Sequence, residues 1–143
     1  MTNEEVSEHG SSEDGDLALK VLMAQGLKIR GEVLGAEHVE RSMANVSDFS
    51  RPVQEFVTAL CWGGVWSREG LDRRTRSLLN LVMLTALNRS QELAVHVRGA
   101  ITNGATVTEI QEALLQTAAY VGAPAALESF RVADRVLSEI GDV

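Results

Sequence analysis

Residues 72–87 constrain the fold more than any other part of the 143-residue chain. Their central stretch, SLLNLVMLTAL, is apolar on nearly every side of a helix. Such a helix has to be covered by other helices or by a partner subunit. The stretch is too short to cross a membrane, which takes about 20 apolar residues. We therefore expect this to be the most buried helix of a helical protein, with no membrane association.

Helix start and stop signals divide the rest of the chain into further helical segments. Pro52 suits the first turn of a helix, because proline loses no needed hydrogen bond there. Thr106 and Glu109 have the spacing of a capping box, and Asn103-Gly104 suits a left-handed helix end. The expected helices cover residues 17–35, 50–63, 72–87, 90–103, 106–121 and 124–137. The last of them turns Leu127, Phe130, Ala133 and either Val136 or Leu137 inward.

No stretch of the sequence alternates between apolar and polar residues with a period of two, so we predict no sheet. The hydrophobic fraction is 45% and the aromatic fraction is 4%, which indicates a folded protein with an aliphatic core. The length suits one ordinary domain. The predicted fold class is all-α, a compact bundle of about six to seven helices.

The first sixteen residues differ in composition from the rest. They hold six acidic groups and no Lys or Arg, and so account for six of the seven net negative charges. We interpret residues 1–16 as an acidic flexible tail and residues 17–143 as the helical domain. The body is almost neutral and has no basic tract, so we expect a small molecule or a protein as partner, rather than nucleic acid or a membrane.

The sequence has a single cysteine, Cys61. One thiol excludes an internal disulfide, a CxxC redox pair and a zinc site built mainly on thiolates. Between Leu60 and Trp62, Cys61 is interpreted as a small buried hydrophobic residue. The amino terminus lacks the basic and apolar regions of a signal peptide, so we expect a cytoplasmic protein.

Glu92 and His96 are four residues apart on one predicted helix, which places them on the same face. A carboxylate there can fix the tautomer of the imidazole or raise its pKa. Imidazole titrates near neutrality, so the pair suits proton transfer. The same spacing is also common in ordinary helix-surface pairs, and the pattern leaves both interpretations open.

Other side chains are candidates for binding a substrate. A guanidinium group can hold a carboxylate with two parallel hydrogen bonds, although arginines also occur on solvated faces. Both tryptophans lie within five residues beside Gly63-Gly64, either as core or as a pocket wall. His38 can cap a helix or line a pocket, but no third ligand at recognisable spacing accompanies it and His96, so we predict no metal site. The candidates are Arg74, Arg76, Arg98, Trp62, Trp66 and His38.

Three long stretches of the sequence resemble the γ-carboxymuconolactone decarboxylase family. They are RGEVLGAEHVERSMANVSDFSRPVQEF, WGGVWSREGLDRRTRSLLNLVMLTAL and ELAVHVRGAITNGATVTEIQEALLQTAAYVGAPAALESF. Together they cover almost all of residues 30–130, and their order and their spacing both agree with the family pattern. The resemblance implies an all-helical fold like that of alkyl hydroperoxidase D, assembled as a homotrimer or homohexamer.

The resemblance also implies a reaction. An acidic unsaturated lactone loses carbon dioxide to give an enol-lactone, a lyase step in the protocatechuate branch of aromatic degradation. The electrons of the broken bond flow into the lactone carbonyl, so no cofactor is needed. By this resemblance His96 donates the proton or stabilises the oxyanion, Glu92 orients it, and an arginine from the candidate set anchors a carboxylate. Trp62 and Trp66 supply a dry wall.

The chain departs from the family pattern at three positions. An acidic residue is usual where Gly64 stands, a proline where Glu69 stands, and a cysteine often replaces Val121. These departures keep two alternatives open. One is a divergent enzyme that catalyses another cofactor-free proton transfer, ring opening or rearrangement of a small acidic metabolite in a biosynthetic pathway. The other is a non-catalytic oligomer that binds a ligand.

Overall fold

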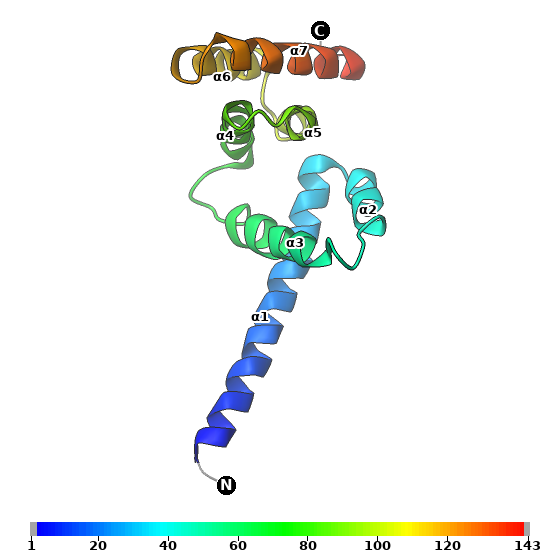
Figure 1. The fold of residues 1–143 in the computed structure, drawn as a ribbon, viewed down its shortest axis with the longest axis vertical. Coiled ribbons are helices and arrows are strands. Elements are labelled where there is room, and N and C mark those ends of the chain that lie inside the picture. Colours follow the sequence, from blue (N-terminus) through cyan, green and yellow to red (C-terminus); the bar gives the residue numbers. More distant parts are fainter. Residues whose placement is uncertain (1–2, 142–143) are drawn as a thin grey trace. The chain divides into compact units, whose positions relative to one another are not determined.

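The computed structural model describes residues 3–141, with side chains described from residue 12 (Figure 1). Within that range the chain forms seven α-helices and one π-helix, and no strand. This confirms the all-α prediction. The chain divides into two compact units, unit 1 up to Arg68 and unit 2 from Glu69. Each unit is described by itself below.

Unit 1 contains α1 (Asn3–Leu34), α2 (Ala36–Ala44), α3 (Arg51–Phe56) and the π-helix η1 (Val57–Val65). The helix predicted from residue 50 starts as expected but changes to π geometry at Val57 and continues past Gly63-Gly64. Trp66 N donates to Cys61 O at 3.1 Å, the i to i+5 spacing of a π-helix. Helix α2, which was not predicted from the sequence, has nine residues and begins directly after Gly35.

Glycines allow α1 and η1 to pack at very close range. A Cβ atom at Gly26 would lie 1.9 Å from Thr58 O, and one at Gly63 would lie 2.2 Å from Leu22 O. No side chain fits at such distances from another backbone, so glycine is required at both positions. This contact places the buried face of η1, which carries Thr58 and Trp62, against α1.

The structure shows residues 3–16 as the first part of α1, where the sequence analysis predicts a flexible tail. Residues 12–21 are exposed, and the first buried position of the helix is Gly26. Residues 1 and 2 lie outside the described part of the chain. The boundary at residue 16, and the assignment of 17–143 to one domain, stay predictions.

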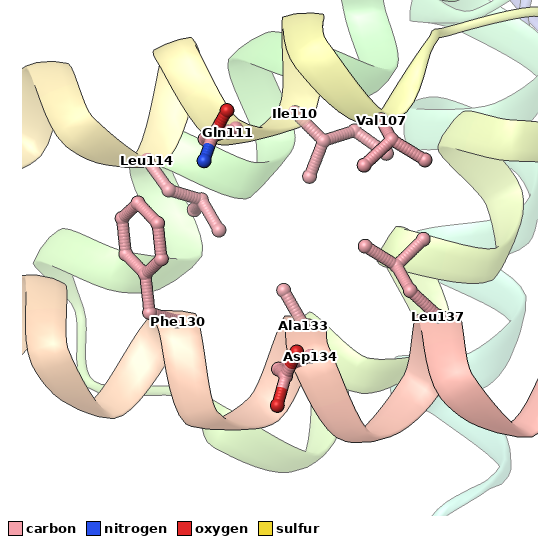
Figure 2. A pocket seen from close by; sticks show the side chains of 8 residues that line it. All are labelled: Val107, Ile110, Gln111, Leu114, Phe130, Ala133, Asp134 and Leu137. Atoms are coloured by element: carbon pink, nitrogen blue, oxygen red, sulfur yellow. The ribbon is translucent and has the colours of Figure 1, made fainter. Parts of the chain in front are cut away.

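Unit 2 contains α4 (Arg73–Ala86), α5 (Ser90–Thr102), α6 (Val107–Tyr120) and α7 (Ala123–Ile140). Its helix ends follow local rules. Thr106 and Glu109 form the predicted capping box, and Gly104 and Gly122 have positive φ angles of 88° and 114° where helices end. Pro124 lies in the first turn of α7, as predicted. Side chains of α6 and α7 face each other across a small cavity (Figure 2).

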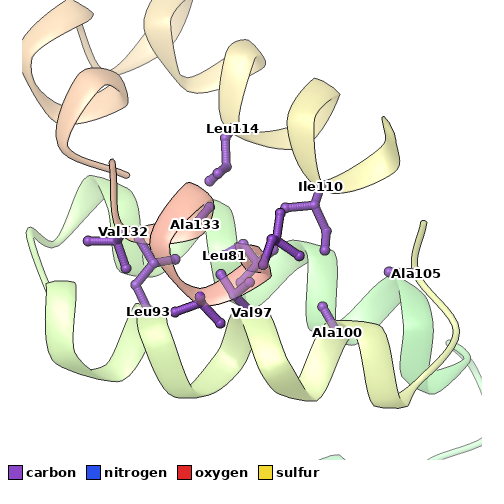
Figure 3. Close-up of a cluster of buried hydrophobic side chains, with 11 residues drawn as sticks. Leu81, Leu93, Val97, Ala100, Ala105, Ile110, Leu114, Val132 and Ala133 are labelled. Carbon is purple, nitrogen blue, oxygen red and sulfur yellow. The ribbon is translucent and has the colours of Figure 1, made fainter. Parts of the chain in front are cut away.

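The core of unit 2 is aliphatic and draws on all four helices (Figure 3). Leu81, Leu93, Val97, Ile110 and Leu114 are almost completely buried. The predictions for Ala133, Val136 and Leu137 are confirmed, while Phe130 is half-buried. The prediction for Leu127 is wrong, because this side chain is 57% exposed.

The apolar helix α4 is not fully buried within the chain. Ser77, Leu81 and Thr85 form its buried face, whereas Leu79, Met83 and Leu87 are exposed. The expectation that 72–87 is the most buried segment is therefore wrong for the single chain, because α4 packs with α5 and α6 on one side only. A partner subunit is the alternative that stays open for the other side. Among the described residues, no helix combines the length and hydropathy that a membrane span requires.

Candidate active site

The clearest polar contact around His96 joins two helices of unit 2. His96 lies half-buried on α5, and its Nδ1 atom is 3.4 Å from Nδ2 of Asn80 on α4. The sequence analysis did not single out Asn80. It is the one amide in the apolar stretch SLLNLVMLTAL, and a polar side chain in such a run is a signal that could have identified it.

The contact with Asn80 is compatible with one tautomer of the neutral imidazole. An amide NH₂ group can only donate, so His96 Nδ1 accepts when the Asn80 amide has this orientation. The neutral ring then carries its proton on Nε2. A neutral imidazole with Nε2–H can donate to an oxyanion or to a carbanion, which is the role predicted for His96.

Glu92 lies one turn before His96 on α5 and is exposed. The hydrogen bond observed at Nδ1 of His96 comes from Asn80. The structure thus provides an orienting residue on a neighbouring helix in addition to the predicted one. The role of Glu92 stays a prediction.

The candidate arginines Arg74 and Arg98 form ion pairs within unit 2. Arg74 lies 2.9 Å from Glu109, the capping-box carboxylate of α6, and Arg98 pairs with Glu139 of α7. The hydrogen bond from the Thr106 backbone, with the charge of Arg74 as a smaller cause, lowers the pKa of Glu109. A substrate carboxylate would have to compete with these glutamates.

Arg76 has a different position. It is half-buried on α4, one turn before Asn80 and on the same face of the helix. Asn80 is the residue that contacts His96. By helical position, Arg76 is the candidate arginine that lies beside the Asn80–His96 pair.

The two tryptophans form an apolar cluster in unit 1. Their rings stack with centroids 4.8 Å apart and an angle of 24° between the planes. They pack with Ile29 and Val33 of α1, and both are buried. The pair forms core, and whether an edge of it also contacts substrate stays a prediction.

Unit 1 also holds a buried arginine that the sequence analysis did not identify. Arg30 is 8% exposed. Its Nη1 atom donates to Gln54 Oε1 at 3.1 Å and to Thr58 Oγ1 at 3.2 Å, and lies 3.8 Å from Met43 Sδ. Burial lowers the pKa of Arg30. All these partners are neutral, and no sequence pattern indicates in advance that this arginine faces the core.

The remaining polar candidates lie elsewhere in unit 1. His38 is half-buried in α2, and the Gly35 N-cap of that helix receives no side-chain hydrogen bond. Cys61 is exposed on η1, so its interpretation as a buried residue is wrong. Within the described residues, no three His, Cys, Asp or Glu side chains are grouped so that they could hold a metal ion.

Each unit contains a cavity or groove. The cavity of unit 2 has a volume of about 120 Å³ and is lined by α6 and α7, with Gln111 and Asp134 as its polar side chains (Figure 2). A groove of about 380 Å³ lies between α1 and α2 in unit 1, and Met43 is part of its wall. The predicted site residues line neither of them.

Gly64, one of the three departures from the family pattern, has room for a side chain. A Cβ atom there would lie 3.8 Å from Ala59 O, an ordinary van der Waals contact. Packing therefore requires glycine at Gly63 but does not require it at Gly64. The backbone at Gly64 therefore accepts a Cβ atom, at the position where the resemblance leads us to expect an acidic residue.

Comparison with known proteins decides the family. A sequence model described as the carboxymuconolactone decarboxylase family matches residues 51–135. The chain belongs to this family. Family membership agrees with the resemblance found in the sequence, and with the all-helical, alkyl hydroperoxidase D-like fold.

Two relatives match this carboxymuconolactone decarboxylase family member with the same sequence identity, but their names differ. A 4-carboxymuconolactone decarboxylase of Acinetobacter baylyi is 44% identical over 82% of this chain and 87% of its own length. The nitrosuccinic acid decarboxylase npaB of Metarhizium robertsii is 44% identical over 85% of each chain. Both names describe the removal of a carboxyl group.

Proposed function

We propose that the chain catalyses the cofactor-free decarboxylation of a carboxylated unsaturated lactone of the γ-carboxymuconolactone type, giving an enol-lactone. The observation that carries the proposal is the 3.4 Å contact between Asn80 and His96. It gives a member of this family a half-buried, oriented imidazole that can move a proton. The 44% identity to a 4-carboxymuconolactone decarboxylase supports the choice of substrate.

The chemistry of this step needs an electron sink, and the substrate itself contains one. When the bond to the carboxylate breaks, carbon dioxide leaves and the electron pair passes through the double bond into the lactone carbonyl. The resulting dienolate takes a proton on the ring carbon next to the carbonyl. The protein has to bind the carboxylates, stabilise the oxyanion and deliver the proton.

In this proposal His96 donates to the oxyanion or to the ring carbon through Nε2, and Asn80 holds the ring in the required tautomer. Arg76 is the preferred anchor for a carboxylate, because it lies one turn from Asn80 on α4. Arg74 and Arg98, which pair with Glu109 and Glu139, are further candidates. Glu92, Trp62 and Trp66 keep the roles that the resemblance implies, and His38 stays a candidate for lining the substrate pocket.

A second substrate is supported by the second relative. Nitrosuccinic acid carries the departing carboxylate on the carbon that bears the nitro group, so the nitro group takes up the electron pair as a nitronate. The identity to the nitrosuccinic acid decarboxylase equals that to the lactone enzyme. Both molecules also share a succinate skeleton, since a CH₂COO⁻ group is attached to the carbon that loses carbon dioxide.

Assembly as a homotrimer or homohexamer is part of the proposal. Leu79, Met83 and Leu87 expose an apolar strip of α4 that a neighbouring subunit can cover. The proposed compartment is the cytoplasm, which the single cysteine supports.

The test is an assay of purified protein with γ-carboxymuconolactone and with nitrosuccinate, in the presence of EDTA. Carbon dioxide released in equal amount to the substrate consumed is the expected result, and the faster substrate identifies the natural class. The His96→Gln variant should lose turnover at least about 100-fold while its assembly is unchanged. Failure of both substrates at high enzyme concentration would favour another proton transfer or rearrangement, and binding without product would favour a ligand-binding oligomer.

A further inference from the structure

We infer that Arg30 is a binding site for a carboxylate group of a small dicarboxylic acid. The starting observation is a buried cation without a counter-ion. Arg30 is more than nine-tenths buried, and no carboxylate of the described residues forms an ion pair with it. A buried charge is costly unless it is paired, so an unpaired arginine at this depth points to an anion that binds from outside the chain.

The hydrogen bonds of Arg30 leave one edge of the guanidinium for such an anion. The contacts to Gln54, Thr58 and Met43 all run from Nη1. Nε is buried and has no partner among the described residues. Nε and Nη2 form the planar pair of donors that matches the two oxygens of a carboxylate. A carboxylate bound there would satisfy Nε and neutralise the charge.

Two acidic side chains of unit 1 pair with other arginines. Glu37 pairs with Arg41 and Asp48 pairs with Arg51, both on exposed surfaces. The partners that Arg30 does have, an amide, a hydroxyl and a thioether, orient the guanidinium without cancelling its charge. They hold the side chain in place for a ligand.

We take the occupant to be a small molecule, because Met43, a contact of Arg30, also lines a groove of suitable size. Met43, whose Sδ lies 3.8 Å from Arg30 Nη1, also lines the groove of about 380 Å³ between α1 and α2. Sites for small ligands begin at about 300 Å³. Lys28 lines the same groove and adds a second positive charge for a second carboxylate, while Glu40 on the opposite side limits the net charge that the groove accepts.

The inference rests on the proposed function only for the class of the ligand, so the test uses a dicarboxylate that cannot react. Succinate has the skeleton shared by both proposed substrates but no electron sink. Its affinity is measured by titration calorimetry at constant ionic strength, with sodium chloride as balance. The wild type is expected to bind succinate, and Arg30→Met to bind it about 10- to 100-fold more weakly, as for the loss of charged hydrogen bonds.

Arg41→Met is the matched control, because it removes an exposed arginine of the same unit. It should bind succinate like the wild type. If Arg30→Met does not fold, as judged by circular dichroism, Arg30→Lys takes its place; it keeps the charge without the fork, and its affinity should fall by about 10-fold. Equal affinity of the Arg30 variant and the wild type would overturn the inference.

The carboxylate that binds Arg30 could also come from an acidic side chain of another copy of the chain. Sedimentation velocity distinguishes this source from a small molecule. Unchanged assembly of Arg30→Met supports the small-molecule site. Loss of assembly together with no succinate binding by the wild type would overturn it and assign Arg30 to a subunit interface. Succinate binding needs no turnover. A protein that binds succinate through Arg30 but decarboxylates neither substrate would therefore refute the proposed reaction and leave the Arg30 site supported.

Discussion

Asn80 on α4 and His96 on α5 meet at 3.4 Å, with the amide nitrogen of one facing Nδ1 of the other. Asn80 is the one amide in the apolar stretch of α4, and His96 is a half-buried residue of α5. Their contact turns a histidine that the sequence marks only weakly into an oriented imidazole, and it identifies α4 as a contributor to the site as well as to the core.

The Asn80→Asp variant should raise the pKa of His96. A carboxylate next to the imidazole favours the charged ring, so the limb of the pH profile of kcat that reports His96 moves to higher pH. Asn80→Ala should instead lower kcat about 10-fold with little change in KM, as expected for the loss of one orienting hydrogen bond. Asn88→Asp adds the same charge at an exposed position and serves as the control. Superimposable profiles for the two aspartate variants would exclude Asn80 from a positioning role.

Neighbouring glycines of η1 should respond oppositely to alanine. Gly63→Ala places a Cβ 2.2 Å from the Leu22 carbonyl oxygen, so α1 and η1 have to separate, and the free energy of unfolding should fall by about 2 kcal/mol or more. Gly64→Ala meets only ordinary contact at 3.8 Å and should be neutral or stabilise by up to about 1 kcal/mol, as alanine reduces the freedom of the unfolded chain. Urea denaturation of both variants measures the difference. Equal stabilities would show that the close approach of the two helices is absent in solution.

Acid should weaken the protein partly through two helix caps. The hydrogen bond from the Thr75 backbone lowers the pKa of Asp72, and that from the Thr106 backbone lowers the pKa of Glu109. A lowered folded-state pKa means that the stabilisation is present above the ordinary carboxyl pKa of about 4 and is lost as the pH falls through the folded-state value. Glu109→Gln should therefore flatten the decline of Tm below about pH 5. Glu112→Gln, an exposed change on the same helix, should keep the wild-type slope, and an identical decline in all three proteins would contradict the prediction.

The apolar strip of α4 should hold the subunits together. Met83 is 52% exposed in the single chain, and Met83→Glu places a charge that a dry interface cannot accept. We expect the sedimenting mass to fall toward that of the monomer. Gln116→Glu adds the same charge to an exposed position on α6 and should leave the mass unchanged. A Met83→Glu variant that keeps the wild-type mass would show that the strip lies outside the interface.

Local chemistry explains which features were predictable. The capping box of Thr106 and Glu109, the left-handed helix end at Gly104 and the start of α7 at Pro124 depend on residues a few positions apart, and all appear as expected. The family, too, follows from linear stretches of residues that recur in order. The sequence by itself therefore determined the helix ends of unit 2, the fold class and the type of reaction.

Tertiary structure decided the features that join distant parts of one unit. Asn80 and His96 are sixteen residues apart, and Arg30 and Thr58 are twenty-eight apart. Whether a polar residue in an apolar helix faces a histidine, or an arginine faces the core without a carboxylate, depends on how helices cross. Those crossings are set by close contacts such as that of Gly63 with α1, and helical periodicity reports which face of a helix is apolar but not what lies opposite it.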